Sequence, residues 1–297
     1  MSSRRLVIAS LVGVVAVGCA GPRFGSSGSP ESSGPAKPLS YVAVGDSFAA
    51  APGVPDPAPP TGCRKSTNGY PSILARRLGA TRFVDVTCSG ATTENITGRA
   101  QLTKDGPIAR QIDAVGVTTD LITITVGAND VGLPSDAEGC EVKSADPPPC
   151  ANEFVVGNVD HLSEVTSAQW PVWSALIDRL RVAAPHARIV VVGYGTFVRP
   201  GGCFPAQPVL SRDSDYLQSK LNELDDQQQQ LAADKEIDYF DTRLISRGHD
   251  ICASPSDRYI EGFVTTGSAV PLHPNAFGAA AVGNALAGYL GKSGPRH

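Results

Sequence analysis

Residues 40–48 of the chain read SYVAVGDSF, an apolar and β-branched run that stops abruptly at a glycine followed by polar residues. The run Ser40–Val44 is typical of a strand, and Gly45 marks its end. A strand that ends in this way delivers Asp46 and Ser47 to the carboxyl edge of its sheet, where open α/β sheets place their ligand crevices. We therefore expect a parallel sheet with a functional crevice beside Ser47.

The rest of the chain alternates strand and helix patterns at similar spacing. Strands are expected at Ser40–Val44, Arg82–Val86, Leu121–Val126, Arg188–Val192 and Ile237–Phe240. Helices are expected at Tyr70–Leu78, Pro107–Val115, Pro171–Ala183, Ser211–Ala233 and Asn275–Leu290. This alternation predicts an α/β fold, a three-layer α/β/α sandwich with a central, mainly parallel five-stranded sheet.

Two stretches interrupt the alternation and carry little periodicity, Val131–Thr166 and Gly195–Pro208. Long irregular segments of a compact domain are usually functional or disordered. Both follow strands whose ends should face the crevice, so we interpret them as its walls, stiffened by disulfides. The alternative is that they are surface insertions without a role in the site.

Composition narrows the class of protein. The chain has 297 residues, a net charge of −4 and 41% hydrophobic residues, as expected for a globular protein with a core. No run of Lys and Arg suggests binding to a phosphate backbone, so we expect no nucleic-acid partner. We also expect a monomer.

The amino terminus has the pattern of an export signal. Arg4 and Arg5 precede the short apolar stretch 6–18, which ends in small residues before Cys19. Cys19 in this context resembles a bacterial lipobox, in which the cysteine is lipidated, and the alternative is ordinary cleavage after Ala20. We expect an exported protein, either a cell-envelope lipoprotein or a fully secreted one.

The expected organisation follows from these signals. Residues 1–19 form a signal peptide with a lipobox-like end, and residues 20–38 form a Gly/Ser/Pro-rich tether. Residues 39–291 form a single domain, and residues 292–297 are a C-terminal tail. Because no second long apolar segment occurs, we expect contact with a membrane only through the N-terminal anchor.

Apart from Cys19 the chain holds six cysteines, an even number that indicates disulfides in an exported protein. Sequence alone does not choose among the possible pairings. The simplest pairing joins neighbours: Cys63–Cys88, Cys140–Cys150 and Cys203–Cys252. The spacing of cysteines and histidines suggests no metal site.

Polar residues follow two apolar runs and precede the last helix, in the segments Gly45–Phe48, Gly127–Asp130 and Leu272–Asn275. A serine, an asparagine and a histidine brought to one crevice would supply a nucleophile, an oxyanion donor and a general base. That combination is the chemistry of acyl transfer.

These segments, together with Gly90 after the second strand, resemble in order the four motif blocks of the SGNH (GDSL-type) hydrolases. The six cysteines, the Gly-Asp-Ser-Phe opening and the Leu-His-Pro-Asn close are similar to the secreted actinobacterial esterase and lipase branch with three disulfides. The resemblance covers residues 39–290 and implies a flavodoxin-like sandwich. It also implies a serine esterase or lipase that acts on acyl esters or lipids without a metal or other cofactor.

The resemblance implies a role for each matching residue. Ser47 is the nucleophile and His273 the general base, while the backbone N–H groups of Ser47 and Gly90 and the side-chain amide of Asn129 form the oxyanion hole. The alternatives are a helix cap for Ser47 and turn-forming roles for Gly90 and Asn129. Of the other histidines, only His249 competes as the base.

Most of the family has an aspartate three residues before the histidine, and here that position is Val270. In the branch that this chain resembles, a backbone carbonyl takes the role, so we expect the Val270 carbonyl to orient His273. A remote carboxylate, Asp250 or Glu261, is the alternative.

Two other functions stay open: an acyltransferase to a sugar or lipid alcohol with the same site, and a non-catalytic lipoprotein that binds glycan or lipid.

Overall fold

The computed structural model describes residues 38–142 and 147–292. The predicted signal peptide 1–19, the lipidation site Cys19 and the tether up to residue 37 lie outside the described residues, as do residues 293–297 of the tail. The predictions on these segments stay predictions. Within the described part, Pro38 onward belongs to one compact unit.

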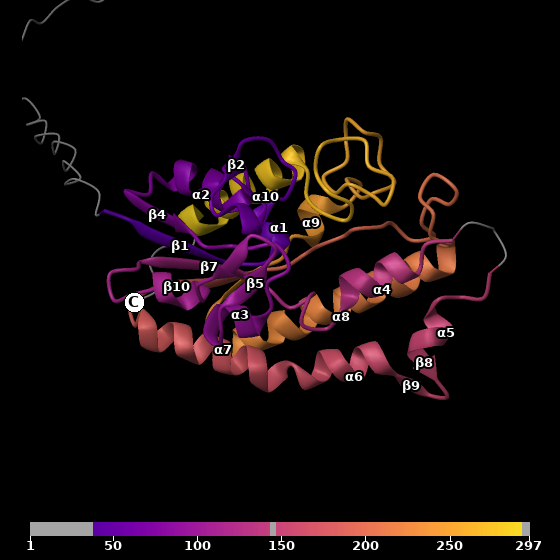
Figure 1. Cartoon of the computed structure of the whole chain (residues 1–297), viewed down its shortest axis with the longest axis horizontal. Helices are drawn as coiled ribbons and strands as arrows, with labels where there is room; N and C mark the ends of the chain where they lie inside the picture. The colour runs from indigo at the N-terminus through magenta and orange to yellow at the C-terminus, as the bar shows by residue number, and fades with distance from the viewer. Residues whose placement is uncertain (1–37, 143–146, 293–297) are drawn as a thin grey trace, which may run out of the picture. The chain divides into compact units, whose positions relative to one another are not determined.

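A five-stranded parallel sheet forms the centre of this unit, as the sequence predicts (Figure 1). Its strands are β1 Ser40–Gly45, β4 Arg82–Asp85, β7 Leu121–Thr125, β10 Arg188–Val192 and β11 Asp238–Phe240. Their order is β11-β10-β7-β1-β4, and every pair is parallel. The chain thus builds outward from β1 in both directions, so the topological switch point lies between β1 and β7. Such switch points hold the ligand crevice of open α/β sheets.

Side chains alternate across the sheet and form a separate core on each face. On one face Tyr41 and Ala43 of β1 pack with residues of α2 (Tyr70–Leu78) and α10 (Ala276–Lys292). On the other face Val42 and Val44 pack with residues of α3 (Thr93–Thr97) and α7 (Trp170–Ala183). The two groups of helices lie on opposite sides of the sheet in Figure 1, which completes the three layers.

The remaining elements are short apart from one long helix. They are α1 Ser47–Ala50, α4 Leu133–Gly139, α5 Ala151–Phe154, α6 His161–Ala168, α8 Ser211–Asp234 and α9 Arg243–Ser246, with 3-10 turns at Thr61–Cys63 and Gln111–Ala114. Three two-stranded ribbons complete the set: β2 Pro57–Ala58 with β3 Lys65–Ser66, β5 Gln101–Thr103 with β6 Gly106–Ile108, and β8 Val155–Val156 with β9 Val159–Asp160. Helices α2, α7, α8 and α10 agree with the predicted ones within two residues at each end.

The predicted helix Pro107–Val115 is wrong. Its first residues pair in the β5–β6 hairpin, and only Gln111–Ala114 form a 3-10 turn. The reason lies in Gln111, whose buried side chain accepts a hydrogen bond from the Gly45 N–H at 2.6 Å and donates one to the Gly45 carbonyl at 2.9 Å. This tertiary contact at the end of β1 overrides the local helical pattern.

The two stretches predicted to be irregular differ from each other. Val131–Thr166 contains α4, α5, the β8–β9 hairpin and part of α6, so it is more regular than expected. Its helix α6 begins at His161, directly after Asp160, whose side chain caps the helix by accepting from Leu162 and Ser163. Gly195–Pro208 has no helix or strand.

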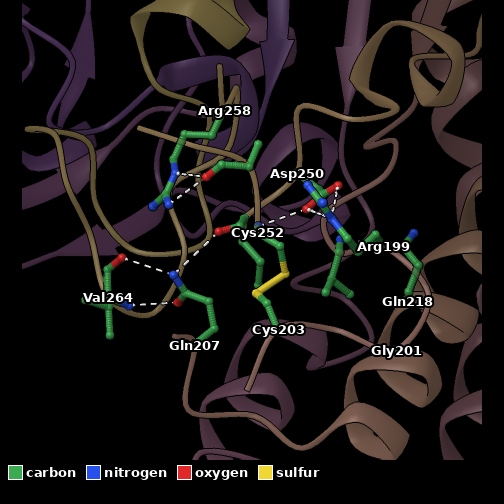
Figure 2. Close-up of a disulfide and its surroundings, with 12 residues drawn as sticks. Arg199, Gly201, Cys203, Gln207, Gln218, Asp250, Cys252, Arg258 and Val264 are labelled. Atoms are coloured by element: carbon green, nitrogen blue, oxygen red, sulfur yellow. Dashed lines mark hydrogen bonds and ion pairs between the residues drawn. A yellow bond between two sulfur atoms is a disulfide. The ribbon is translucent and has the colours of Figure 1, made fainter. Parts of the chain in front are cut away.

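The described residues contain three disulfides, and they join the neighbouring pairs that the simplest pairing gives: Cys63–Cys88, Cys140–Cys150 and Cys203–Cys252. Figure 2 shows the last of them, which joins the irregular segment after β10 to the segment that follows α9. Disulfides form and persist in oxidising compartments, so they agree with the predicted export.

Among residues 38–142 and 147–292, no helix combines the length and the apolar character that crossing a membrane requires. The same residues hold no group of three His, Cys, Asp or Glu side chains arranged to ligate a metal ion.

Candidate active site

Ser47 is the first residue of α1, directly after β1. The carboxylate of Asp46 caps this short helix by accepting a hydrogen bond from the Phe48 N–H at 2.9 Å. Asp46 itself is buried, whereas Ser47 is partly exposed. The cap fixes the turn that presents the Ser47 hydroxyl at the carboxyl edge of the sheet.

Gly45 is required by the close approach of two strands at this point. Its φ is 148°, and a Cβ would lie 2.4 Å from the carbonyl oxygen of Thr125 on β7. Past Asp85 the neighbouring strand β4 has ended, and the side-chain amide of Gln111 bonds the Gly45 backbone. Sequence reasoning missed Gln111, because its partner lies 66 residues away and no local pattern points to it.

Gly90 lies in the turn after β4 with a φ of 77°, which favours glycine. A Cβ at this position would meet only the Gln101 side chain at 3.8 Å, so the space around it is open. Among the described residues, neither the Gly90 N–H nor the Ser47 N–H donates to a protein group. Two unpaired N–H groups are the donors that an oxyanion hole needs.

The loop after β7 is hydrogen-bonded to the turn that contains Gly90. The Asn129 side-chain amide donates to the Ala91 carbonyl at 3.0 Å, and an amide nitrogen has a second N–H to offer. Asp130 accepts from the backbone N–H and the hydroxyl of Thr93, at 2.9 and 3.1 Å. Asp130 therefore bonds the two loops to each other and holds them at a fixed separation.

His273 lies in the segment before α10. Its Nδ1 is 2.6 Å from the carbonyl oxygen of Pro271. A carbonyl oxygen only accepts, so Nδ1 carries the proton and Nε2 is left as the acceptor. This arrangement is what a general base needs.

The orienting carbonyl therefore belongs to Pro271, and the expectation of Val270 is wrong. The reason is the left-handed backbone of Leu272, with a φ of 59°, which folds the Pro271 carbonyl back toward the imidazole. The Val270 backbone is instead bonded to Pro52, its N–H donating to the Pro52 carbonyl at 3.1 Å. An orienting carbonyl is present, but it lies two residues before the histidine rather than three.

The two carboxylates considered as alternatives have other partners. Glu261 accepts from Thr266 at 2.8 Å and from the side chain of Asn275 at 3.1 Å, while its backbone bonds the backbone of Leu272 and His273. Asp250 accepts from Arg199 at 3.0 Å, as Figure 2 shows. Neither carboxylate is bonded to the imidazole.

Electrostatics favour the neutral form of His273. Burial lowers the pKa of its imidazole below the usual 6.5, and the positive charge of Arg64 lowers it further, while the Pro271 carbonyl acts in the opposite sense. At neutral pH the ring is therefore ready to accept a proton.

A cavity of about 120 Å³ brings three of the predicted residues together, because Ser47, Asn129 and His273 all line it. Gly90 is not among the lining residues; it adjoins the site through Ala91 and Asn129. Most other lining side chains are apolar: Phe48, Leu133, Pro134, Ala137, Phe197, Val198, Val209, Leu217, Leu221, Ile251, Phe263, Pro271 and Leu272.

The walls come from both of the stretches interpreted as such. Val131–Thr166 contributes α4, and Gly195–Pro208 contributes Phe197 and Val198. Helix α8 also contributes, through Leu217 and Leu221, and the sequence analysis predicted this helix without placing it at the site. His249 does not line the cavity, because its ring stacks on Tyr259 at 3.9 Å and its Nδ1 contacts the Asp257 carbonyl.

Comparison with known proteins agrees with this geometry. The sequence profile of the GDSL-like Lipase/Acylhydrolase family matches residues 43–281, a span that includes all four motif residues. Lipase 2 of Streptomyces coelicolor is 35% identical over 259 residues, which cover 81% of this chain and 82% of the relative. The chain belongs to the GDSL-like lipase/acylhydrolase family.

Solved structures show the same fold. They include a phospholipase A1 from Streptomyces albidoflavus NA297 and an extracellular lipase from Streptomyces rimosus, each 23% identical with a TM-score of 0.70. The first comparison covers 85% of this chain and 98% of the other, and the second 83% and 99%. As a GDSL-like lipase/acylhydrolase, the chain is an ester hydrolase of the lipase or esterase type.

Proposed function

We propose that this chain is an exported serine hydrolase that cleaves carboxylic esters through an acyl-enzyme on Ser47, with His273 as the base. The observation that carries the proposal is the convergence of Ser47, Asn129 and His273 on one cavity whose other walls are mainly apolar. A polar reacting centre beside an apolar pocket suits an ester with a hydrocarbon acyl group.

The first half of the reaction forms the acyl-enzyme. Nε2 of His273 takes the proton of the Ser47 hydroxyl as Oγ bonds to the ester carbonyl carbon. The carbonyl oxygen becomes an oxyanion, which accepts from the N–H groups of Ser47 and Gly90 and from the Asn129 amide. The bond to the alcohol oxygen then breaks, His273 returns its proton to that oxygen, and the alcohol leaves.

The second half repeats these steps with water. His273 takes a proton from a water molecule as its oxygen bonds to the acyl carbon, and the same donors stabilise the oxyanion. The bond to Oγ breaks, Ser47 recovers its proton from His273, and the carboxylic acid leaves. The Pro271 carbonyl holds the imidazole throughout and stabilises the protonated ring, the role that an aspartate has in a triad.

The direct test is labelling of the purified protein by a fluorophosphonate, followed by peptide mapping. We expect the label on Ser47 and hydrolysis of short acyl esters by the unlabelled protein. Adding an alcohol acceptor separates the competing enzyme: a transferred ester in place of free acid would indicate an acyltransferase. Neither label nor turnover would overturn the proposal and favour a non-catalytic binding protein.

Acyl-chain length offers a second test. Ala137 of α4 lines the cavity, and Ala137→Phe would fill part of it. We expect the ratio of kcat/KM for an octanoate to that for an acetate ester to fall roughly tenfold or more, since a few methylenes in an apolar pocket have this effect. Val182→Phe, which introduces the same side chain at an exposed position of α7, serves as the control. An unchanged ratio in Ala137→Phe would place the acyl chain elsewhere.

Export is proposed on two grounds: the three disulfides and the relatedness to a lipase described as extracellular. Attachment through a lipid on Cys19 remains part of this proposal. In that arrangement the substrate is an acyl ester or lipid outside the cytoplasm, and the chain acts as a monomer held at the membrane only by its N-terminal anchor.

A further inference from the structure

Tyr194 is a buried tyrosine outside the four motif blocks. It follows β10 by two residues, is 4% exposed and lines the same cavity as Ser47. We propose that Tyr194 is a positioning residue for ester hydrolysis: its phenol links the loop that carries Ser47 to the loop that carries Asn129 and fixes the spacing of their oxyanion donors. This inference rests on the proposed function.

The contacts of the phenol support this role. Its O–H donates to the carboxylate of Asp46, the residue before Ser47, and its oxygen accepts from the N–H of Ala128, the residue before Asn129, at 3.1 Å. Asp46 and Ala128 follow the ends of the neighbouring strands β1 and β7, so a single oxygen joins the two loops. A small displacement of oxyanion donors has a large effect on rate, because they act at hydrogen-bond distance.

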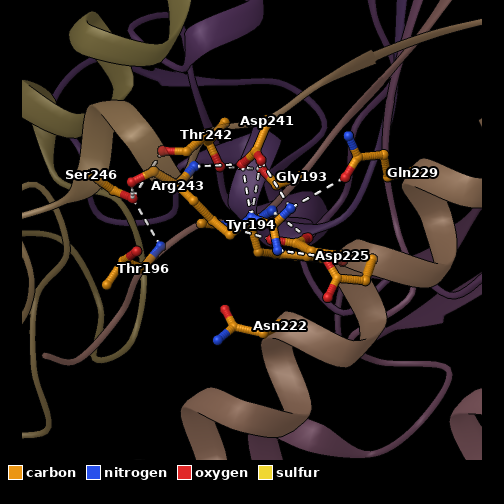
Figure 3. A network of polar contacts seen from close by, with 12 residues as sticks. Gly193, Tyr194, Thr196, Asn222, Asp225, Gln229, Asp241, Thr242, Arg243 and Ser246 are labelled. Carbon is orange, nitrogen blue, oxygen red and sulfur yellow. Dashed lines mark hydrogen bonds and ion pairs between the residues drawn. The ribbon is translucent and has the colours of Figure 1, made fainter. Parts of the chain in front are cut away.

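Tyr194 is itself held in place by the wall of the cavity. Its ring meets the Phe48 ring edge-on at 5.5 Å. The buried carboxylate of Asp225 on α8 accepts from the backbone N–H groups of Tyr194 and Gly195, both at 3.0 Å, within the polar network in Figure 3. The backbone of Tyr194 is therefore anchored to α8, which gives the phenol a fixed base between the two loops.

The protonation of Asp46 provides a readout of this link. The pKa of Asp46 is raised to about 7: burial is the largest cause, the bonds from Tyr194 and Phe48 act against it, and the nearby Asp130 adds to it. Tyr70 of α2 also faces Asp46. The ionised carboxylate accepts from both Tyr194 and Phe48, whereas the protonated group would have to donate to the phenol oxygen instead, so the arrangement seen here forms as pH rises through about 7.

The test is Tyr194→Phe, which keeps the ring and removes the hydroxyl. We expect kcat/KM for a short ester to fall roughly 10- to 100-fold, mainly in kcat, because the oxyanion donors are displaced and not removed. Because the Tyr194 bond lowers the pKa of Asp46, its loss should also move the rising limb of the pH–rate profile to higher pH. The control is Tyr41→Phe, which deletes a buried phenol bonded to Thr123 within the sheet and should leave rate and profile unchanged.

A second variant keeps the inference testable if Tyr194→Phe does not fold. Asp46→Asn removes this titrating group, so the limb near pH 7 should disappear and leave only the limb of the base His273, whose pKa lies below 6.5. Its effect on kcat should be less than additive with that of Tyr194→Phe. Wild-type activity and labelling of Ser47 are measured first; their absence would count against the proposed function. If the wild type is active, equal rates and pH profiles for Tyr194→Phe and Tyr41→Phe would overturn the inference alone, as would a limb near pH 7 that persists in Asp46→Asn.

Discussion

Replacement of Ser47 by alanine should lower kcat for a short acyl ester by roughly 10⁵- to 10⁶-fold, with little change in KM. The loss is large because the variant lacks the hydroxyl that forms the acyl-enzyme next to His273, and the residual rate comes from the oxyanion donors and the cavity. Ser47 contributes a hydroxyl at the surface of the cavity, so its removal should leave the fold intact. The measurement is initial-rate kinetics, with the melting temperature as a check on folding.

The matched control is Ser72→Ala, which removes a hydroxyl from the buried side of α2, away from the cavity. It should retain activity within about threefold of the wild type, since a single hydroxyl outside the reacting centre affects stability more than rate. Retention of more than about 1% of the activity by Ser47→Ala would contradict the serine mechanism.

The parts of this fold that sequence could predict are those with local signals. Apolar runs such as Ser40–Val44 mark strands, and the abrupt change at Gly45 marks the carboxyl edge where the site lies. Because all five strands are parallel, the residues that follow β1 and β7 had to meet at one edge. Ser47 and Asn129 could thus be placed together before any coordinates.

The parts that sequence could not predict depend on contacts between distant residues. Gln111 abandons a helical pattern because it bonds the Gly45 backbone, and Tyr194 joins Asp46 to Ala128 across 148 and 66 residues. No spacing rule encodes either partnership. The carbonyl that orients His273 was misplaced by one residue for a related reason, since the left-handed turn at Leu272 is not a conformation that leucine favours.

His273→Gln should lower kcat by roughly 10⁴- to 10⁶-fold, because the Ser47 hydroxyl then has no base within reach. Burial lowers the pKa of His273, so wild-type activity should rise with pH along a limb below pH 6.5, and His273→Gln should lack that limb. His249→Gln is the control, because His249 stacks on Tyr259 and does not line the cavity. A loss of activity in His249→Gln comparable to that in His273→Gln would show that the base has been misassigned.

The same assay separates a dyad from a triad. Asp250→Asn and Glu261→Gln replace the two candidate carboxylates by amides of the same shape, and neither carboxylate touches the imidazole. We expect activity within about tenfold of the wild type for both, because the Pro271 carbonyl still orients His273. Glu261→Gln should lower the melting temperature, since Glu261 is buried beside Arg258 and bonds Thr266 and Asn275. A folded amide variant as inactive as His273→Gln would mean that a carboxylate, and not a peptide carbonyl, completes the catalytic group.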